Sequence, residues 1–259
     1  MGPFRYIFSF LIGLCFGSFA TVVTYRLPRG KSVVRLRSSC VSCSHRLGVA
    51  DLVPVFSWIT LQGRCRYCKN KISVRYLLVE LLCGILFLCM ARLTVSPSLI
   101  PLAAFAFVLL QIAIIDMDTK TIPDGLVIGG MVSGLLWVVL AFVFPGCFPL
   151  APLWYDALLG ALVGGLSLFV LDRLTLLFLK KDGFGYGDVK LMAMAGLYLG
   201  WQLAIVALFV AFVAAGVYAG FLLFTGRAKR GEYIAFGPYI CAGSLLSLWF
   251  SEPISYFIW

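Results

Sequence analysis

The stretch Leu99–Asp116, LIPLAAFAFVLLQIAIID, is a run of apolar residues that closes on a carboxylate. An α-helix crosses the hydrocarbon core of a bilayer with roughly 17 to 25 mostly apolar residues, and this run has that length and composition. A charged side chain at the edge of lipid is costly, so an aspartate in this position is a functional candidate. The stretch therefore predicts a membrane helix with a functional residue at its end.

The rest of the chain repeats this apolar pattern. Hydrophobic residues make up 62% of the 259 residues and charged residues only 12%, too few to cover a soluble core. Backbone polar groups must be satisfied inside lipid, and no alternation of polar and apolar residues suggests a barrel, so the segments are predicted to be helices. We predict an all-α polytopic membrane protein with about eight transmembrane helices, at residues 6–25, 76–95, 99–115, 126–144, 157–179, 189–201, 202–224 and 236–258.

Pairs of glycines four residues apart recur in these segments, as at Gly13 and Gly17 and at Gly160 and Gly164. Glycines at this spacing lie on one face of a helix and let a neighbouring backbone approach closely. With 26 glycines in the chain, we interpret the pattern as close helix packing and not as a specific dimer motif.

A basic, polar insert separates the first two apolar segments. Eleven of the 21 Lys and Arg lie in residues 26–75, against one acid, Asp51. The sequence is therefore divided into a first transmembrane helix (1–25), a cytosolic basic domain (26–75) and a transmembrane domain (76–259). The net charge of +10 is concentrated in this insert and in short turns, so we predict membrane lipid and not nucleic acid as its surroundings.

Four cysteines in the insert have the spacing of a metal site: Cys40-x-x-Cys43, then Cys65-x-x-Cys68. Two such pairs are typical of a zinc ribbon, in which two short turns supply four thiolates. Paired disulfides or free thiols remain alternatives, and His45, the only histidine of the chain, is an alternative ligand. A zinc with four cysteine ligands has no open position for water, so the predicted metal is structural. With one histidine, Ser-His-Asp and HExxH sites are excluded away from the insert.

A second carboxylate stands beside another apolar segment. Asp188 closes the sequence Gly185-Tyr186-Gly187-Asp188, directly before a further apolar run. The glycines leave room for a backbone or an extended substrate, and the amino end of a helix favours negative charge. Two carboxyls close enough that only one ionises can act as base and acid on a water molecule. Asp116 and Asp188 are therefore the predicted catalytic pair.

Asp118 is nearer to Asp116 in sequence but is a poorer partner. Residues two positions apart on a helix point about 200° apart around its axis. The carboxyls of Asp116 and Asp118 therefore cannot share a proton if the helix continues. We interpret Asp118 as capping or solvating the helix end beside Lys120. N-capping is also the alternative role for Asp188.

Other acidic residues have simpler interpretations. Asp124 is expected to be a turn or N-cap residue of the fourth segment. Asp172 and Arg173, within the fifth segment, are expected to neutralise each other or to reach toward the membrane boundary. Glu80, near the inner end of the second segment, is expected to pair with Arg75 or to contact substrate.

Lys and Arg also mark one side of the predicted membrane. If the insert is cytoplasmic, eight segments place the turns at Lys120, at residues 180–181 and at residues 227–230 on the same side, and all three are basic. The opposite turns, at residues 96–98, 145–152 and near 201, carry no Lys or Arg. The positive-inside rule then makes the basic side cytoplasmic. The same count puts both Asp116 and Asp188 at that face.

Four stretches resemble the bacterial type IV prepilin peptidases, which also serve type II secretion. They are residues 17–28; the cysteine insert with Ser57-Trp58 and Gly63-Arg64-Cys65-Arg66-Tyr67-Cys68; Asp116 through Ile122-Pro123-Asp124; and Gly183-Phe184-Gly185-Tyr186-Gly187-Asp188-Val189-Lys190-Leu191. The last is highly specific, and together they span most of the chain. The family has proline after its first cysteine where this chain has Val41, which leaves the metal ligands intact.

The resemblance implies a multi-pass aspartic protease of the GxGD type in the bacterial inner membrane, with its catalytic face in the cytoplasm. Such an enzyme removes the basic leader of prepilins or pseudopilins after a glycine and N-methylates the new terminal residue, with S-adenosylmethionine as methyl donor. In the family pattern the first aspartate precedes Ile-Pro by six and seven residues, which selects Asp116 over Asp118. A non-catalytic membrane scaffold or transporter with a zinc-ribbon docking module is the alternative.

Overall fold

The structure is a computed structural model, and it describes residues 4–33, 38–94, 96–144, 146–180, 183–227 and 234–251. Within these ranges the regular structure is helical, apart from two isolated antiparallel bridges in the insert. Among the described residues, six helices are long and apolar enough to cross a membrane. The predicted all-α membrane fold is therefore confirmed.

The chain forms two compact units, Met1–Val95 and Ser96–Trp259. The first contains two long helices, α1 (Phe4–Arg26) and α3 (Val74–Leu93), with the insert between them. The insert carries only short helices: η1 (Leu27–Arg29), η2 (Val49–Asp51) and α2 (Phe56–Thr60). This division places α3, which the sequence analysis grouped with the later helices, in the first unit.

Glycines bring α1 and α3 together. A methyl group added at Gly17 would lie 2.6 Å from the Cα of Glu80, and one at Gly13 would lie 2.8 Å from the Cα of Gly84. Glu80 in turn accepts a hydrogen bond from the backbone N–H of Val55, at 2.7 Å, and so ties the insert to α3.

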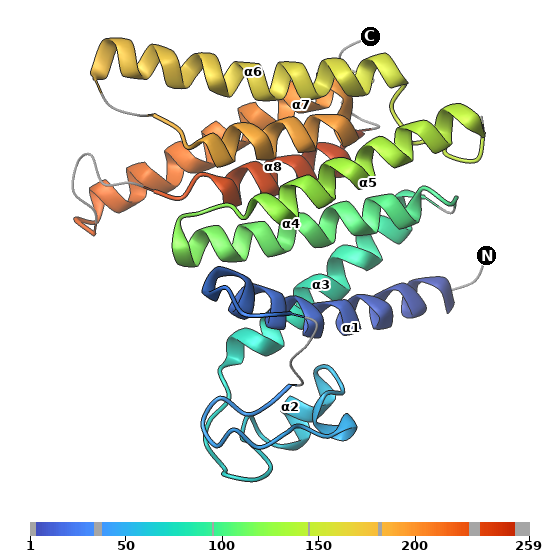
Figure 1. Ribbon diagram of the computed structural model, residues 1–259, viewed down its shortest axis with the longest axis vertical. Coiled ribbons are helices and arrows are strands. Elements are labelled where there is room, and N and C mark those ends of the chain that lie inside the picture. The colour runs from blue at the N-terminus through green and yellow to red at the C-terminus, as the bar shows by residue number, and fades with distance from the viewer. Residues whose placement is uncertain are drawn as a thin grey trace. The chain divides into compact units, whose positions relative to one another are not determined.

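The second unit contains α4 (Leu99–Thr119), α5 (Asp124–Val143), α6 (Trp154–Leu179), α7 (Tyr186–Phe224) and α8 (Gly237–Trp249). Within this unit α6 packs along α7, and α8 packs against both α7 and α4 (Figure 1). Glycine again allows two helices to pack closely, here α6 and α7. A methyl group at Gly164 would lie 2.8 Å from the backbone oxygen of Met192. Both glycine pairs of the sequence analysis thus serve close helix packing, as predicted.

α7 is a helical hairpin. Gly200 interrupts it with φ 73° and ψ 172°, a conformation essentially confined to glycine. A straight helix from Phe184 to Phe212 would span about 40 Å, yet the centroids of these two rings lie 5.6 Å apart. The second half of α7 therefore folds back along the first.

This reversal accounts for the predicted sixth and seventh segments. The predicted boundary between them follows residue 201, and the chain turns at Gly200. With the two halves of α7 counted separately, the described residues contain eight long helical segments in the predicted order. The last, α8, ends at Trp249; the remainder of the predicted eighth segment, from residue 252, lies outside the described residues.

Candidate active site and metal centre

The four cysteines of the insert form one cluster. The sulfur atoms of Cys40, Cys43, Cys65 and Cys68 all lie within 4.8 Å of one another. The Cys40 and Cys68 sulfurs are 3.9 Å apart, close to the roughly 3.8 Å edge of a tetrahedron with zinc–sulfur bonds of about 2.3 Å. The predicted ligand set is therefore arranged as a metal site, and its donors and spacing fit zinc.

Two turns of the same geometry hold the ligands. The N–H of Cys40 donates to the carbonyl of His45, and the N–H of Ser44 donates to the carbonyl of Cys40, both at 2.9 Å. The backbone of Cys65 repeats these bonds with the residues five and four positions later, at 2.9 and 3.0 Å. The side chain of His45 packs against the ring of Tyr67 in a tilted arrangement, with ring centroids 3.7 Å apart, so four cysteines make up the cluster without it.

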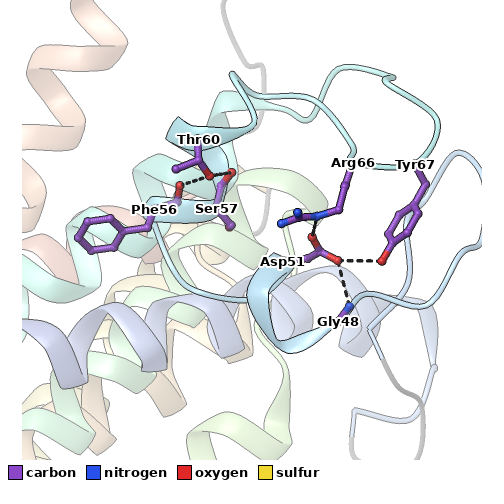
Figure 2. Close-up of polar contacts among 7 residues, drawn as sticks. All are labelled: Gly48, Asp51, Phe56, Ser57, Thr60, Arg66 and Tyr67. Carbon is purple, nitrogen blue, oxygen red and sulfur yellow. Dashed lines mark hydrogen bonds and ion pairs between the residues drawn. The ribbon is translucent and has the colours of Figure 1, made fainter.

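The single acid of the insert, Asp51, holds the second turn (Figure 2). Asp51 accepts from the N–H of Gly48 at 3.0 Å, from Nε of Arg66 at 2.6 Å and from the hydroxyl of Tyr67 at 3.3 Å. The Arg66 guanidinium holds the pKa of Asp51 below its usual range. Arg66 and Tyr67 lie between the ligands Cys65 and Cys68, so Asp51 braces the second turn.

Asp116 lies in the last turn of α4 and is only 3% exposed. The helix ends after it because Lys120 adopts a left-handed conformation, with φ 53°, and donates its N–H to the Asp116 carbonyl at 2.8 Å. The carboxylate of Asp116 accepts a hydrogen bond of 3.0 Å from the backbone N–H of Gly237, the first residue of α8. Asp116 is thus fixed between the end of one helix and the start of another.

Asp188 lies in the first turn of α7 and is also 3% exposed. Its carboxylate accepts a hydrogen bond of 3.2 Å from the N–H of Gly185, the residue before the helix. This bond satisfies one of the free N–H groups at the helix start. Asp188 is therefore not itself the N-cap residue, which is Gly185; it lies at the third position of the helix and bonds back to the N-cap through one carboxylate oxygen.

The two aspartates meet at one end of the second unit. Ile122 packs against Gly187, which precedes Asp188 in α7, and against Gly237, which donates its N–H to Asp116. A methyl group at Gly187 would lie 3.0 Å from the Cβ of Ile122, and one at Gly237 would lie 3.3 Å from its Cδ1. The two aspartates therefore lie around the same side chain, Ile122. Two buried carboxylates, each held by one backbone N–H, therefore share this end of the helices.

The neighbouring acids lie elsewhere. Asp118 is exposed, on a different face of α4 from Asp116. Asp124 is the first residue of α5, one position after the N-cap Pro123. Its carboxylate forms an exposed ion pair of 2.8 Å with Lys190 of α7.

Asp172 has a role that the sequence analysis missed. It was expected to neutralise Arg173 or to reach toward the membrane boundary; its Oδ1 accepts the backbone N–H groups of Gly183 and Phe184, both at 3.1 Å. Arg173 instead contacts the hydroxyl of Tyr186. Asp172 therefore anchors the loop that leads to Asp188. The sequence feature that could have indicated this role is an aspartate within an apolar segment.

The contact of Gly237 with Asp116 was not predicted from the sequence either. Its N–H reaches Asp116 across a large separation along the chain, which no local pattern reveals. The only sequence signal was the pair Gly237-Pro238 at the start of an apolar run, which indicates the beginning of a helix.

Two family models match the chain in succession. The model for the bacterial peptidase A24 N-terminal domain matches residues 11–94, and the model for the type IV leader peptidase family matches residues 103–220. The first ends and the second begins close to the boundary between the two structural units. No solved structure matches the chain.

Proteins named prepilin leader peptidase/N-methyltransferase are similar over nearly the whole chain. The one from Myxococcus xanthus is 38% identical over 97% of this chain and 74% of its own length. The one from Aeromonas hydrophila is 36% identical over 95% of this chain and 91% of its own length, and the one from Pseudomonas putida is 35% identical over 93% and 90%. With both family models matched in order, the chain belongs to the type IV leader peptidase family.

Proposed function

We propose that this protein is a prepilin leader peptidase and N-methyltransferase in which Asp116 and Asp188 carry out the peptide cleavage. It cuts the leader of a type IV prepilin or a type II secretion pseudopilin after a glycine and methylates the new amino terminus. The observation that carries the proposal is the convergence of two buried carboxylates at one end of the second unit.

The geometry suits activation of a water molecule. Two adjacent carboxyls in a poorly solvated site cannot both ionise, so together they hold one proton. The ionised member takes a proton from water as the water attacks the scissile carbonyl, and the protonated member donates to the departing group. The N–H groups of Gly237 and Gly185 each occupy one oxygen of a carboxylate, at 3.0 and 3.2 Å. The other oxygen of each is left for the water and the substrate.

Substitution of each aspartate tests this proposal. Asp116→Asn and Asp188→Asn should each remove most cleavage of a purified prepilin while the protein remains folded in the membrane. The double variant should be little worse than either single one, because the two residues act as a unit.

Asp118→Asn is the matched control, since Asp118 lies two residues from Asp116 and is exposed. It should cleave at nearly the parental rate. An active Asp116→Asn variant together with an inactive Asp118→Asn variant would reverse the assignment.

The four-cysteine cluster is proposed to bind structural zinc through Cys40, Cys43, Cys65 and Cys68. A bound zinc ion would supply the cross-link that folds a small module with little apolar core. The insert and the catalytic end of the helices are proposed to face the cytoplasm of the bacterial inner membrane, where the basic leader of a prepilin remains.

The methyl donor is proposed to be S-adenosylmethionine. Transfer of an isotope-labelled methyl group from this donor to the cleaved product would test it. The scaffold or transporter alternative is not favoured, because it has no need of two buried aspartates at one end of a bundle, and it predicts no shortened prepilin in the cleavage assay.

A further inference from the structure

Gly237 makes an unusually close approach to Asp116. A methyl group added there would lie 2.6 Å from Oδ2 of Asp116 and 3.2 Å from its Cγ. Contacts under about 3 Å do not occur between such atoms without displacement of one of them. The backbone of Gly237 is not in the left-handed region, so a side chain is opposed here by the Asp116 carboxylate and not by the backbone conformation.

The residue before Gly237 belongs to an aromatic cluster. The ring of Phe236 lies 5.2 Å from the ring of Phe184 and 5.2 Å from that of Phe212, by centroids. Phe184 and Phe212 are themselves 5.6 Å apart. Aromatic pairs at such distances contribute roughly 0.5 to 1.5 kcal/mol each beyond the area that they bury. The start of α8 is therefore packed against the loop before α7 and against the returning half of α7.

The same loop is anchored to α6. Asp172 is only 6% exposed, and its Oδ1 holds the N–H groups of Gly183 and Phe184 at 3.1 Å. Phe184 is thus fixed at its backbone by α6 and at its ring by Phe236. The next residue of the loop, Gly185, donates its N–H to Asp188.

These contacts form a continuous path between the two carboxylates. It runs from Asp188 through the Gly185 loop to Phe184, from that ring to Phe236, and from the Gly237 N–H to Asp116. Building on the proposed function, we propose that Gly237 and Asp172 are positioning residues that set the two aspartates relative to each other. Gly237 acts on Asp116 directly through its N–H, and Asp172 acts through the loop and the Phe184–Phe236 contact.

Gly237→Ala is the first test, made on the full-length protein in detergent with a purified prepilin as substrate. The added methyl group should displace the Asp116 carboxylate, and misplacement of a reacting group by about 1 Å can cost about 100-fold in rate. We expect kcat to fall at least tenfold with KM within twofold of the parent, because binding of the prepilin is not altered. Helix propensity favours alanine over glycine, so the melting temperature should not fall with the rate.

Gly129→Ala is the matched control for this substitution. Gly129 is an exposed helical glycine of α5 with no atom within 4 Å of an added methyl group. It should leave kcat and KM unchanged. Equal kcat in Gly237→Ala and the parent would overturn the role of Gly237.

Asp172 is tested by a pair of variants. Asp172→Leu keeps the volume but removes the acceptor for Gly183 and Phe184, and we expect kcat to fall about tenfold or more. Asp172→Asn keeps an oxygen at the same position, and we expect it to recover most of the kcat that the leucine variant loses. Equal loss in both variants, or a rise in KM alone, would contradict a positioning role.

The outcomes separate this inference from the function on which it rests. If Asp116→Asn and Asp188→Asn remain active, the proposed catalytic pair fails. If both are inactive while Gly237→Ala and Asp172→Leu cleave at the parental rate, only the positioning path fails.

Discussion

Single glycines decide how closely the helices of this protein approach. Gly196 lies in the first half of α7 where it crosses α6, and a methyl group there would lie 2.7 Å from the backbone nitrogen of Ala161. Gly216 lies in the second half of the same helix, and no atom lies within 4 Å of a methyl group added there. Both positions are glycine, but only Gly216 has room for an added methyl group.

This contrast gives a prediction about stability. Gly196→Ala should destabilise the second unit by about 1 to 3 kcal/mol, the usual cost of overpacking, because the obstacle is backbone and cannot rotate away. Gly216→Ala should be neutral or slightly stabilising. Thermal unfolding of both variants in the same detergent measures the difference, and equal melting temperatures would contradict the packing.

At the scale of elements, the insert is built from two equivalent turns. Each presents two cysteines and closes with a residue in the left-handed conformation, Ser44 with φ 58° and Lys69 with φ 61°. Neither residue is a glycine, and each conformation costs free energy. The cysteine cluster at which the turns meet is suited to offset that cost by binding metal.

Metal content tests this element. Protein purified without chelator should contain about one zinc per chain, as four thiolates bind one ion. Cys40→Ser or Cys68→Ser should lose the metal and make the insert sensitive to proteolysis, since metal binding and folding of such a module are coupled. Cys147→Ser is the control, because Cys147 is exposed and lies outside the cluster. Parental metal content in both ligand variants would refute the site.

At the scale of the whole molecule, the charges of the turns predict how the second unit is oriented in the membrane. The turn after α4 contains Lys120 and adjoins Asp116, whereas the described residues between α5 and α6, 146–153, carry no charge. The positive-inside rule predicts that the first turn lies in the cytoplasm and the second outside.

Reporter fusions test this orientation. A fusion after Thr121 should be active only with a cytoplasmic reporter, and a fusion after Leu150 only with a periplasmic one. The opposite result at either position would overturn the proposed orientation. It would also remove the catalytic end from the side where the leader lies.

The sequence by itself determined the membrane class, the order of the eight segments and the four cysteines that form the cluster, because apolar length and cysteine spacing are local properties of the chain. It also singled out Asp116 and Asp188 as candidates, since carboxylates beside apolar runs are costly wherever they fold. Their catalytic role stays a prediction that the variants above test.

Only the tertiary structure decided what surrounds these residues. The N–H of Gly237 reaches Asp116, and the carboxylate of Asp172 reaches Gly183 and Phe184 instead of Arg173. The reversal at Gly200 brings Phe212 back to Phe184. Each contact joins residues that are distant along the chain, and its partner is chosen by how whole helices pack. No periodicity or spacing encodes that choice locally, so it appears only when the helices are assembled.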